Sequence, residues 1–177
     1  MAAAAVMLMM LAPTVVAKAP ADVSGTWDVA FVDRLRTPAW VAQDILGIVP
    51  EGPMTQIICT GSGSMTLTQA GASFSGTYVQ SSNQCVTKAG QVFQDPLTFI
   101  PFSVLGEING SSLSLFIDGP ALDCDYRAVI ADVDQGVATA ISGGGPCIVP
   151  GHPKSDVPSG PPPAGTSVTL SFVAWRP

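Results

Sequence analysis

Apolar and polar residues alternate along most of this chain, as they do in strands that bury one face. The last segment, 167–175, places Val168, Leu170, Phe172 and Ala174 on one side and Thr169, Ser171 and Val173 on the other. The first segment repeats this alternation with Trp27, Val29 and Phe31 on its apolar side. Such segments start near residues 24, 56, 64, 73, 98, 111, 123 and 137, with a ninth near 167. Since no long helical period separates them, the pattern predicts an all-β meander.

Two-residue turns set the expected pairing of neighbouring strands. Asn109-Gly110 tolerates positive φ at both positions and predicts a hairpin with Phe102 opposite Ile117. Ala70-Gly71 predicts a second hairpin, with Leu67 opposite Phe74. Gln135-Gly136 predicts a third, with Asp134 opposite Val137. Hairpins that follow one another in this way are typical of an up-and-down sheet.

A meander of eight to nine strands removes its exposed edges when it closes into a barrel. The sequence therefore predicts an up-and-down β-barrel with one short helix after the first strand. The helix is expected over residues 37–47, because Pro38 suits a first turn and Gly47 suits a position just past the end. Trp40 lies on its apolar side, so we expect the helix to cover a barrel mouth.

The chain divides into a leader and one domain. Residues 1–17 carry no charge and include an apolar run over 2–12, followed by small residues suited to cleavage, so we interpret 1–21 as a secretory signal peptide. Residues 22–177 form the predicted barrel. Within it, the Gly- and Pro-rich segment 143–165 is expected to be a surface loop, and it contains His152.

Composition narrows the possible partners. Charged residues make up 11% of the chain, against roughly 25% in average soluble proteins, and the net charge is −6. Seven scattered Lys and Arg cannot form a phosphate-neutralising surface, which argues against nucleic acid. No segment after the leader reaches 18 apolar residues, so we expect no membrane span. Nothing in the residues indicates an oligomeric state.

Four cysteines behind a signal-like leader imply two disulfides and a secreted or periplasmic protein. The register of the Gln135-Gly136 hairpin places Cys124 opposite Cys147, within disulfide reach. The remaining pair is then Cys59–Cys85. In the Ala70-Gly71 register, however, Cys59 faces Ser82, three residues short of Cys85, so a bulge or a loop must absorb the difference. The cysteine spacing does not suit a zinc site, and we predict no metal and no cofactor.

Several short motifs resemble those of the calycin group of small barrels, which includes lipocalins and avidin-like proteins. They are Gly25-Thr26-Trp27 at the first strand, Gly76-Thr77-Tyr78, and Asp125-Tyr126 late in the meander. The resemblance implies a barrel and leaves the ligand open. In lipocalins a basic side chain from the closing strand stacks over the tryptophan, and Arg176 is expected to do this over Trp27. Some bacterial protease inhibitors are similar small secreted barrels.

The sequence favours a binding protein over an enzyme. His152 lies in the predicted loop and does not suit a Ser–His–acid triad. Asp123 and Asp125 share a strand face but are expected to be surface charges. The segment from Asp132 begins like a calcium loop but has Gly143 where the final glutamate belongs, so we interpret it as a turn.

Three hypotheses remain for the function. A small apolar ligand inside the barrel would be held by Trp27, Trp40, Phe74, Tyr78, Phe102 and Phe172. Alternatively, the loops bind a protein partner, as an inhibitor would. In the third hypothesis the barrel is a filled envelope protein of structural role, with large inward side chains occupying its centre.

Overall fold

The structure is a computed structural model that describes the chain except for residues 1–18, 45–46, 51, 95–98, 120–122 and 149–166. Its strands are β1 (Gly25–Pro38), β2 (Met54–Ala70), β3 (Ser73–Thr87), β4 (Val92–Phe93), β5 (Pro101–Asn109), β6 (Ser112–Asp118), β7 (Asp123–Asp134), β8 (Val137–Ile148) and β9 (Ser167–Trp175). A short helical segment, α1 (Ala39–Asp44), follows β1.

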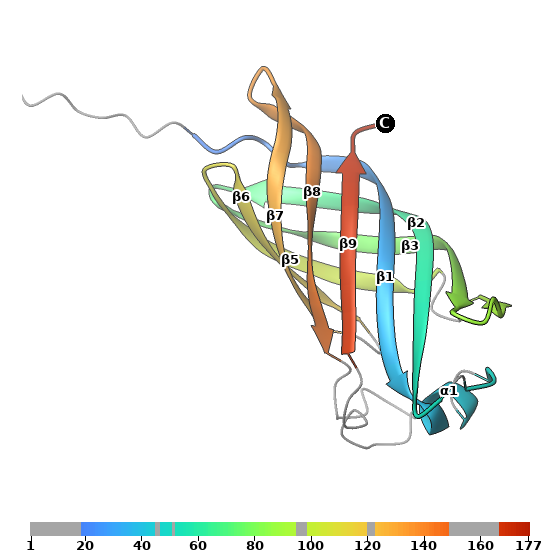
Figure 1. Cartoon of the computed structure of the whole chain (residues 1–177). Helices are drawn as coiled ribbons and strands as arrows, with labels where there is room; N and C mark the ends of the chain where they lie inside the picture. The colour runs from blue at the N-terminus through green and yellow to red at the C-terminus, as the bar shows by residue number, and fades with distance from the viewer. Residues whose placement is uncertain (1–18, 45–46, 51, 95–98, 120–122, 149–166) are drawn as a thin grey trace, which may run out of the picture.

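Eight of these strands close into an antiparallel barrel (Figure 1). Each strand pairs with its neighbour in the meander, and β1 also pairs with β9, so that Asp28 lies opposite Trp175. The two-residue strand β4 adds to the outer edge of β3 and takes no part in the closure. The predicted all-β, up-and-down barrel is confirmed.

Alternation along the strands builds the core. Val168, Phe172 and Ala174 are buried from β9, while Val173 on the opposite face is 49% exposed. Trp27, Val29 and Phe31 are buried from β1 in the same way. Because each strand contributes its apolar face, one continuous cluster fills the barrel.

Two of the three predicted turns lie one residue later than expected. Ala70 pairs with Ser73 and Asn109 pairs with Ser112, so the turns are Gly71-Ala72 and Gly110-Ser111. In both, the glycine takes the first central position, with φ of 65° and 64°. Each change moves a strand partner by two residues, so Leu67 faces Gly76 and Val104 faces Ile117. A shift of two leaves every side chain on its predicted face.

The segments predicted to start near 56 and 64 form one strand, β2. Its pairing with β3 shifts between Ser62 and Gly63, where β3 has one extra residue, Ser81. This bulge and the two-residue shift at the turn together supply the three residues that the predicted register lacked. Cys59 consequently lies opposite Cys85, and the two form the predicted disulfide.

The third hairpin has the predicted register. Asp134 faces Val137 across Gln135-Gly136, whose φ values of 47° and 84° are both positive. Cys124 faces Cys147, and the second predicted disulfide joins them. Two disulfides are suggestive of an oxidising environment.

The prediction of a loop over 143–165 is wrong for residues 143–148, because these residues belong to β8, which continues to Ile148. At Gly143 an added Cβ would lie 2.4 Å from the Cβ of Ala128, and at Gly145 it would lie 2.1 Å from the carbonyl oxygen of Asp125. The glycines therefore allow β8 to pass close to β7. They serve strand packing here, although a glycine-rich sequence resembles a loop. Residues 149–166, including His152, lie outside the described residues.

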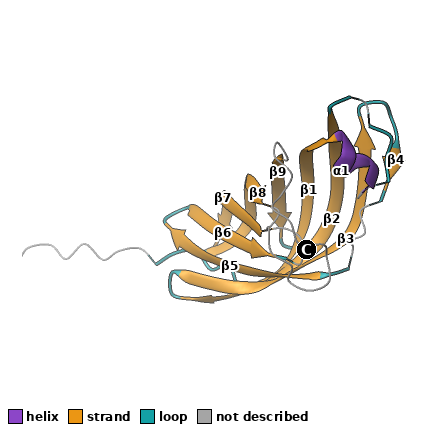
Figure 2. Ribbon diagram, turned by 90° about the horizontal axis from the view of Figure 1, so that it is seen from below, coloured by secondary structure: helices purple, strands orange, loops and turns teal. Residues whose placement is uncertain are grey.

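The ends of β1, β2 and β3 extend beyond the barrel, together with β4 and α1 (Figure 2). A second, smaller apolar cluster lies there, containing Ala42, Ile48, Ile57 and the disulfide Cys59–Cys85. Ala42 of α1 packs in this cluster and not in the barrel core. Since residues 45 and 46 are not described, the helix expected over 37–47 stays a prediction as a whole.

The opposite end of the barrel is plugged by the described N-terminal segment. Val23 is fully buried, and its carbonyl oxygen accepts a hydrogen bond from Trp27 Nε1 at 2.9 Å. The guanidinium of Arg176 lies 4.8 Å from the Trp27 ring centroid, as the sequence predicts. Arg176 Nε also donates to the carbonyl oxygen of Ala138 at 2.6 Å, and Nη2 donates to that of Asp22 at 3.2 Å. The segment, the last strand and β8 are thus joined at one end (Figure 1).

We predict that Arg176→Leu lowers the free energy of unfolding by about 2–3 kcal/mol, because it removes a cation–π contact and two charged hydrogen bonds. Guanidinium chloride unfolding followed by tryptophan fluorescence measures this loss. Arg127→Leu, on the exposed face of β7, is the matched control and should change stability by less than about 0.5 kcal/mol. Equal losses in the two variants would contradict the proposed role of Arg176.

Candidate functional site

A pocket lies inside the barrel, displaced toward the end opposite the Trp27 plug. Along β1 the inward positions run from Trp27 at the plugged end through Phe31 to Asp33, and the pocket begins at Val29. Along β3 it is lined by Tyr78 and Gln80, which lie far from the β2–β3 turn. We call this end, where α1 also lies, the open end.

The pocket has a volume of about 60 Å³. Its walls are mostly apolar, and the lining side chains are Val29, Phe31, Asp33, Met65, Tyr78, Gln80, Phe102, Leu115, Ile117, Cys124, Tyr126, Leu170 and Phe172. Two aromatic pairs fix its shape: Tyr78 and Phe102 have ring centroids 5.9 Å apart, and Tyr126 and Phe172 5.7 Å apart. A volume of this size suits a few atoms rather than a drug-sized molecule.

Polar groups are concentrated on the open-end side of the pocket. Asp33 is the inward residue beyond Phe31, and Gln80 is the one beyond Tyr78. The Tyr126 hydroxyl lies 3.2 Å from Cys147 Sγ, and since that sulfur is in a disulfide, the hydroxyl is the donor. The deeper wall, formed by Val29, Met65, Leu115 and Phe172, is apolar. The pocket thus has an apolar floor and a polar rim.

Both tyrosines are held in the neutral form. Burial raises the pKa of Tyr78 and of Tyr126 well above the usual value near 10, and the negative charge of Asp33 adds to each shift. Uncharged phenol hydroxyls donate hydrogen bonds but do not act as bases near neutral pH. The rim therefore consists of a carboxylate, a carboxamide and two phenols.

The structure brings together half of the predicted ligand-binding residues. Tyr78, Phe102 and Phe172 line the pocket. Trp27 and Phe74 are buried in the core but do not line it. The side chain of Trp40 lies outside the described residues, and none of the described side chains of α1 lines the pocket.

Sequence reasoning missed Asp33, Gln80 and Tyr126 as pocket residues. Asp33 continues the inward series Trp27, Val29, Phe31, so a charged residue at a predicted core position was the available signal. Gln80 continues the inward series Phe74, Gly76, Tyr78 along β3, so a polar residue at an inward position was the available signal there as well.

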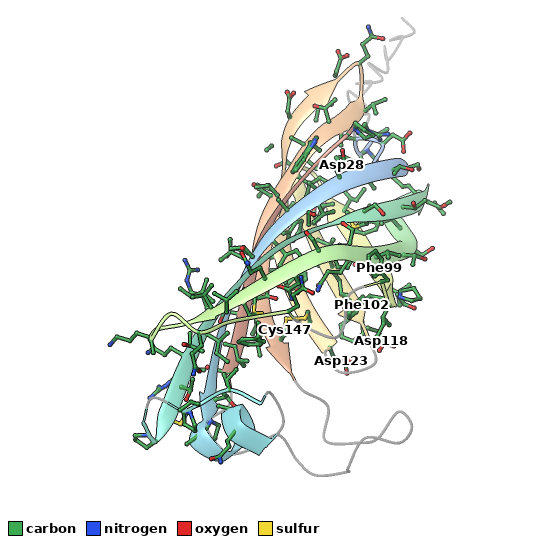
Figure 3. The ribbon with its side chains drawn as sticks, turned by 90° about the vertical axis from the view of Figure 1, so that its right-hand side faces the viewer. Asp28, Phe99, Phe102, Asp118, Asp123 and Cys147 are labelled. Atoms are coloured by element: carbon green, nitrogen blue, oxygen red, sulfur yellow. A yellow bond between two sulfur atoms is a disulfide. The ribbon has the colours of Figure 1, made fainter. Side chains whose placement is uncertain are left out.

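An aromatic residue in an unusual conformation is hydrogen-bonded to the backbone of Gln80. Phe99 has φ of 67°, is 73% exposed, and donates its backbone N–H to the carbonyl oxygen of Gln80 at 2.7 Å. A bulky residue rarely adopts positive φ. Figure 3 shows Phe99 and Phe102 on the part of the barrel away from Asp28. The Phe99 backbone thereby fixes the backbone of Gln80 at the rim.

Two further sets of residues lie outside the pocket. On the outer face, exposed Leu105 and Phe116 line a groove of about 620 Å³ across β5 and β6. Asp118 at the end of β6 pairs with Asp123 at the start of β7, a pairing that the sequence did not predict (Figure 3).

Among the described residues, no three His, Cys, Asp or Glu side chains form a group that could hold a metal ion.

No family model, curated protein or solved structure matches this chain. The part of the chain that the structure describes contains no helix with the length and apolarity needed to span a membrane. The closed eight-strand barrel is compatible with a calycin-like fold.

We predict that neither tyrosine ionises in the folded protein as pH rises through 10 and 11. The chain has two tyrosines, Tyr78 and Tyr126, so absorbance at 295 nm reports on the pocket alone. Because the unfolded chain loses these protons near pH 10 and the folded chain keeps them, stability should fall as pH rises above about 10. Tyrosinate absorbance should appear together with loss of the near-UV circular dichroism. Titration near pH 10 with the fold intact would contradict burial of the pair.

Proposed function

We propose that this chain is a secreted, non-catalytic binding protein whose barrel holds a small apolar ligand, or the apolar end of a larger one, at the open end. The interior pocket carries this proposal. It combines an apolar floor, aromatic walls and a rim of polar groups, and the barrel end behind it is plugged by Val23 and Trp27. A pocket that is apolar with a few convergent polar groups is the usual form of a small-molecule site.

The size of the pocket limits the ligand. Sites that enclose a drug-sized molecule measure roughly 300–1,000 Å³, and an engineered cavity of about 150 Å³ binds benzene. At about 60 Å³ this pocket admits a group of only a few atoms. The proposal is therefore a short ligand or an inserted end group, and it does not include a gate formed by Trp40.

Export and family membership belong to the same proposal. The uncharged apolar run over 2–12 favours a signal peptide, and the disulfides Cys59–Cys85 and Cys124–Cys147 favour an oxidising compartment. The motif Gly25-Thr26-Trp27, with Arg176 stacked on the tryptophan, supports a lipocalin-like member of the calycin group.

A protein-binding role is the second candidate. The groove on the outer face of β5 and β6 carries exposed Leu105 and Phe116, with the charged residues Glu107, Asp125 and Arg127 beside them. Exposed apolar side chains with a polar border are typical of protein contacts. A filled barrel would favour this role or a structural one.

Native mass spectrometry of protein secreted by its own source tests the first proposal. We expect a small passenger to be released from the wild type and absent from Leu170→Phe, which places a larger side chain in the pocket. Val173→Phe is the matched control, since residue 173 lies on the outer face of the same strand and is 49% exposed. This control should retain the passenger.

Xenon provides a probe that needs no knowledge of the ligand. Xenon enters small apolar cavities, so amide NMR shifts should change around the pocket in wild type and in Val173→Phe, and not in Leu170→Phe. If xenon perturbs no pocket residue in the wild type, the barrel is filled and the proposal fails.

A further inference from the structure

The rim of the pocket contains a buried donor without an acceptor. Gln80 is 7% exposed, and its Nε2 has no hydrogen-bond partner among the described residues. Its backbone carbonyl already accepts from Phe99, so the residue is fixed at the rim while its side chain faces the pocket. Buried amide groups in folded proteins nearly always have a partner, supplied by protein, water or ligand. Because the amide faces the pocket, a bound ligand is well placed to supply this acceptor.

The negative charge of Asp33 at the rim restricts the chemical groups that can serve as this acceptor. Among the described residues that line the pocket, Asp33 is the charged one, and none is Lys, Arg or His. A carboxylate end group would bring a second negative charge close to Asp33 in an apolar site, which is unfavourable. An ammonium group would suit Asp33 but has no lone pair to accept from Gln80. A hydroxyl group is uncharged and both accepts and donates.

The order of polar and apolar residues along the pocket wall sets the orientation of a bound ligand. Polar Asp33 and Gln80 lie on the open-end side, whereas Val29, Met65 and Leu115 lie deeper. A ligand with a short hydrocarbon group would place the hydrocarbon on the apolar floor and its hydroxyl at the rim. The volume of about 60 Å³ limits the buried part to a few atoms.

On the basis of the proposed function, we propose that the pocket takes an alcohol: a short apolar group whose neutral hydroxyl accepts a hydrogen bond from Gln80 Nε2 and donates one toward Asp33.

A matched set of probes tests this assignment: 1-butanol, butyrate and butylammonium, titrated at pH 7 and followed by amide NMR shifts of the pocket strands. The three probes share a chain length and differ in the end group. We expect 1-butanol to bind at least tenfold more tightly than butyrate, and more tightly than butylammonium. Equal affinities for the alcohol and the carboxylate would overturn the proposal.

Variants of the rim identify the groups responsible. Gln80→Leu should weaken 1-butanol binding about fivefold, the effect of one lost hydrogen bond. Gln84→Leu is the control, because Gln84 lies four residues along the same strand on the exposed outer face. Unchanged 1-butanol affinity in folded Gln80→Leu would contradict the assignment.

Asp33→Asn provides a gain of binding that loss of folding cannot imitate. Removing the negative charge should raise the affinity for butyrate several-fold and reduce the preference for the alcohol. If the preference is unchanged, Asp33 does not set it and the assignment is wrong.

The outcomes also separate this inference from the proposed function. If xenon enters the pocket but 1-butanol does not bind there, the pocket binds apolar groups and the alcohol assignment fails. If neither probe enters, both proposals fail.

Discussion

The pairing of β1 with β9 is the contact on which the rest of this structure depends. It joins Asp28 to Trp175, residues from nearly opposite ends of the chain, and it turns an open meander into a barrel without free edges in the closure. The same closure brings Arg176 over Trp27 and places Leu170 and Phe172 opposite Tyr78 and Phe102 across the interior. The pocket exists only when β1 and β9 have paired, because its walls come from both the first and the final strands.

The architecture could be predicted from the sequence because side-chain alternation is insensitive to small errors in register. Both misplaced turns, at Gly71 and Gly110, moved the strand partners by two residues, and an even shift keeps each side chain on its face. The Gln135-Gly136 turn was placed correctly, and both of its central residues have positive φ. The disulfide Cys124–Cys147 followed directly from that register. Faces were therefore predictable where exact partners were not.

The elements that sequence reasoning missed depend on packing between strands. A run of glycines at 143–145 resembles a loop until the close approach of β8 to β7 is known. The extra residue at Ser81 reverses the faces of the residues after it, so that Asn83 and Cys85 are buried, and no local pattern marks it. Alternation correctly places Trp27 and Phe74 inward, but both lie in the core away from the pocket. Which inward side chains reach the pocket is a property of the assembled barrel.

The location of Asp22 beside Arg176 has a consequence for the connectivity of the chain. Their contact shows that the two terminal segments of the barrel domain meet at the plugged end. A short peptide linker could join them, and the backbone could be reopened at an exposed hairpin such as Gly110-Ser111. Such a circular permutant would convert the contact of longest sequence separation into a local hairpin, which reduces contact order and should speed folding.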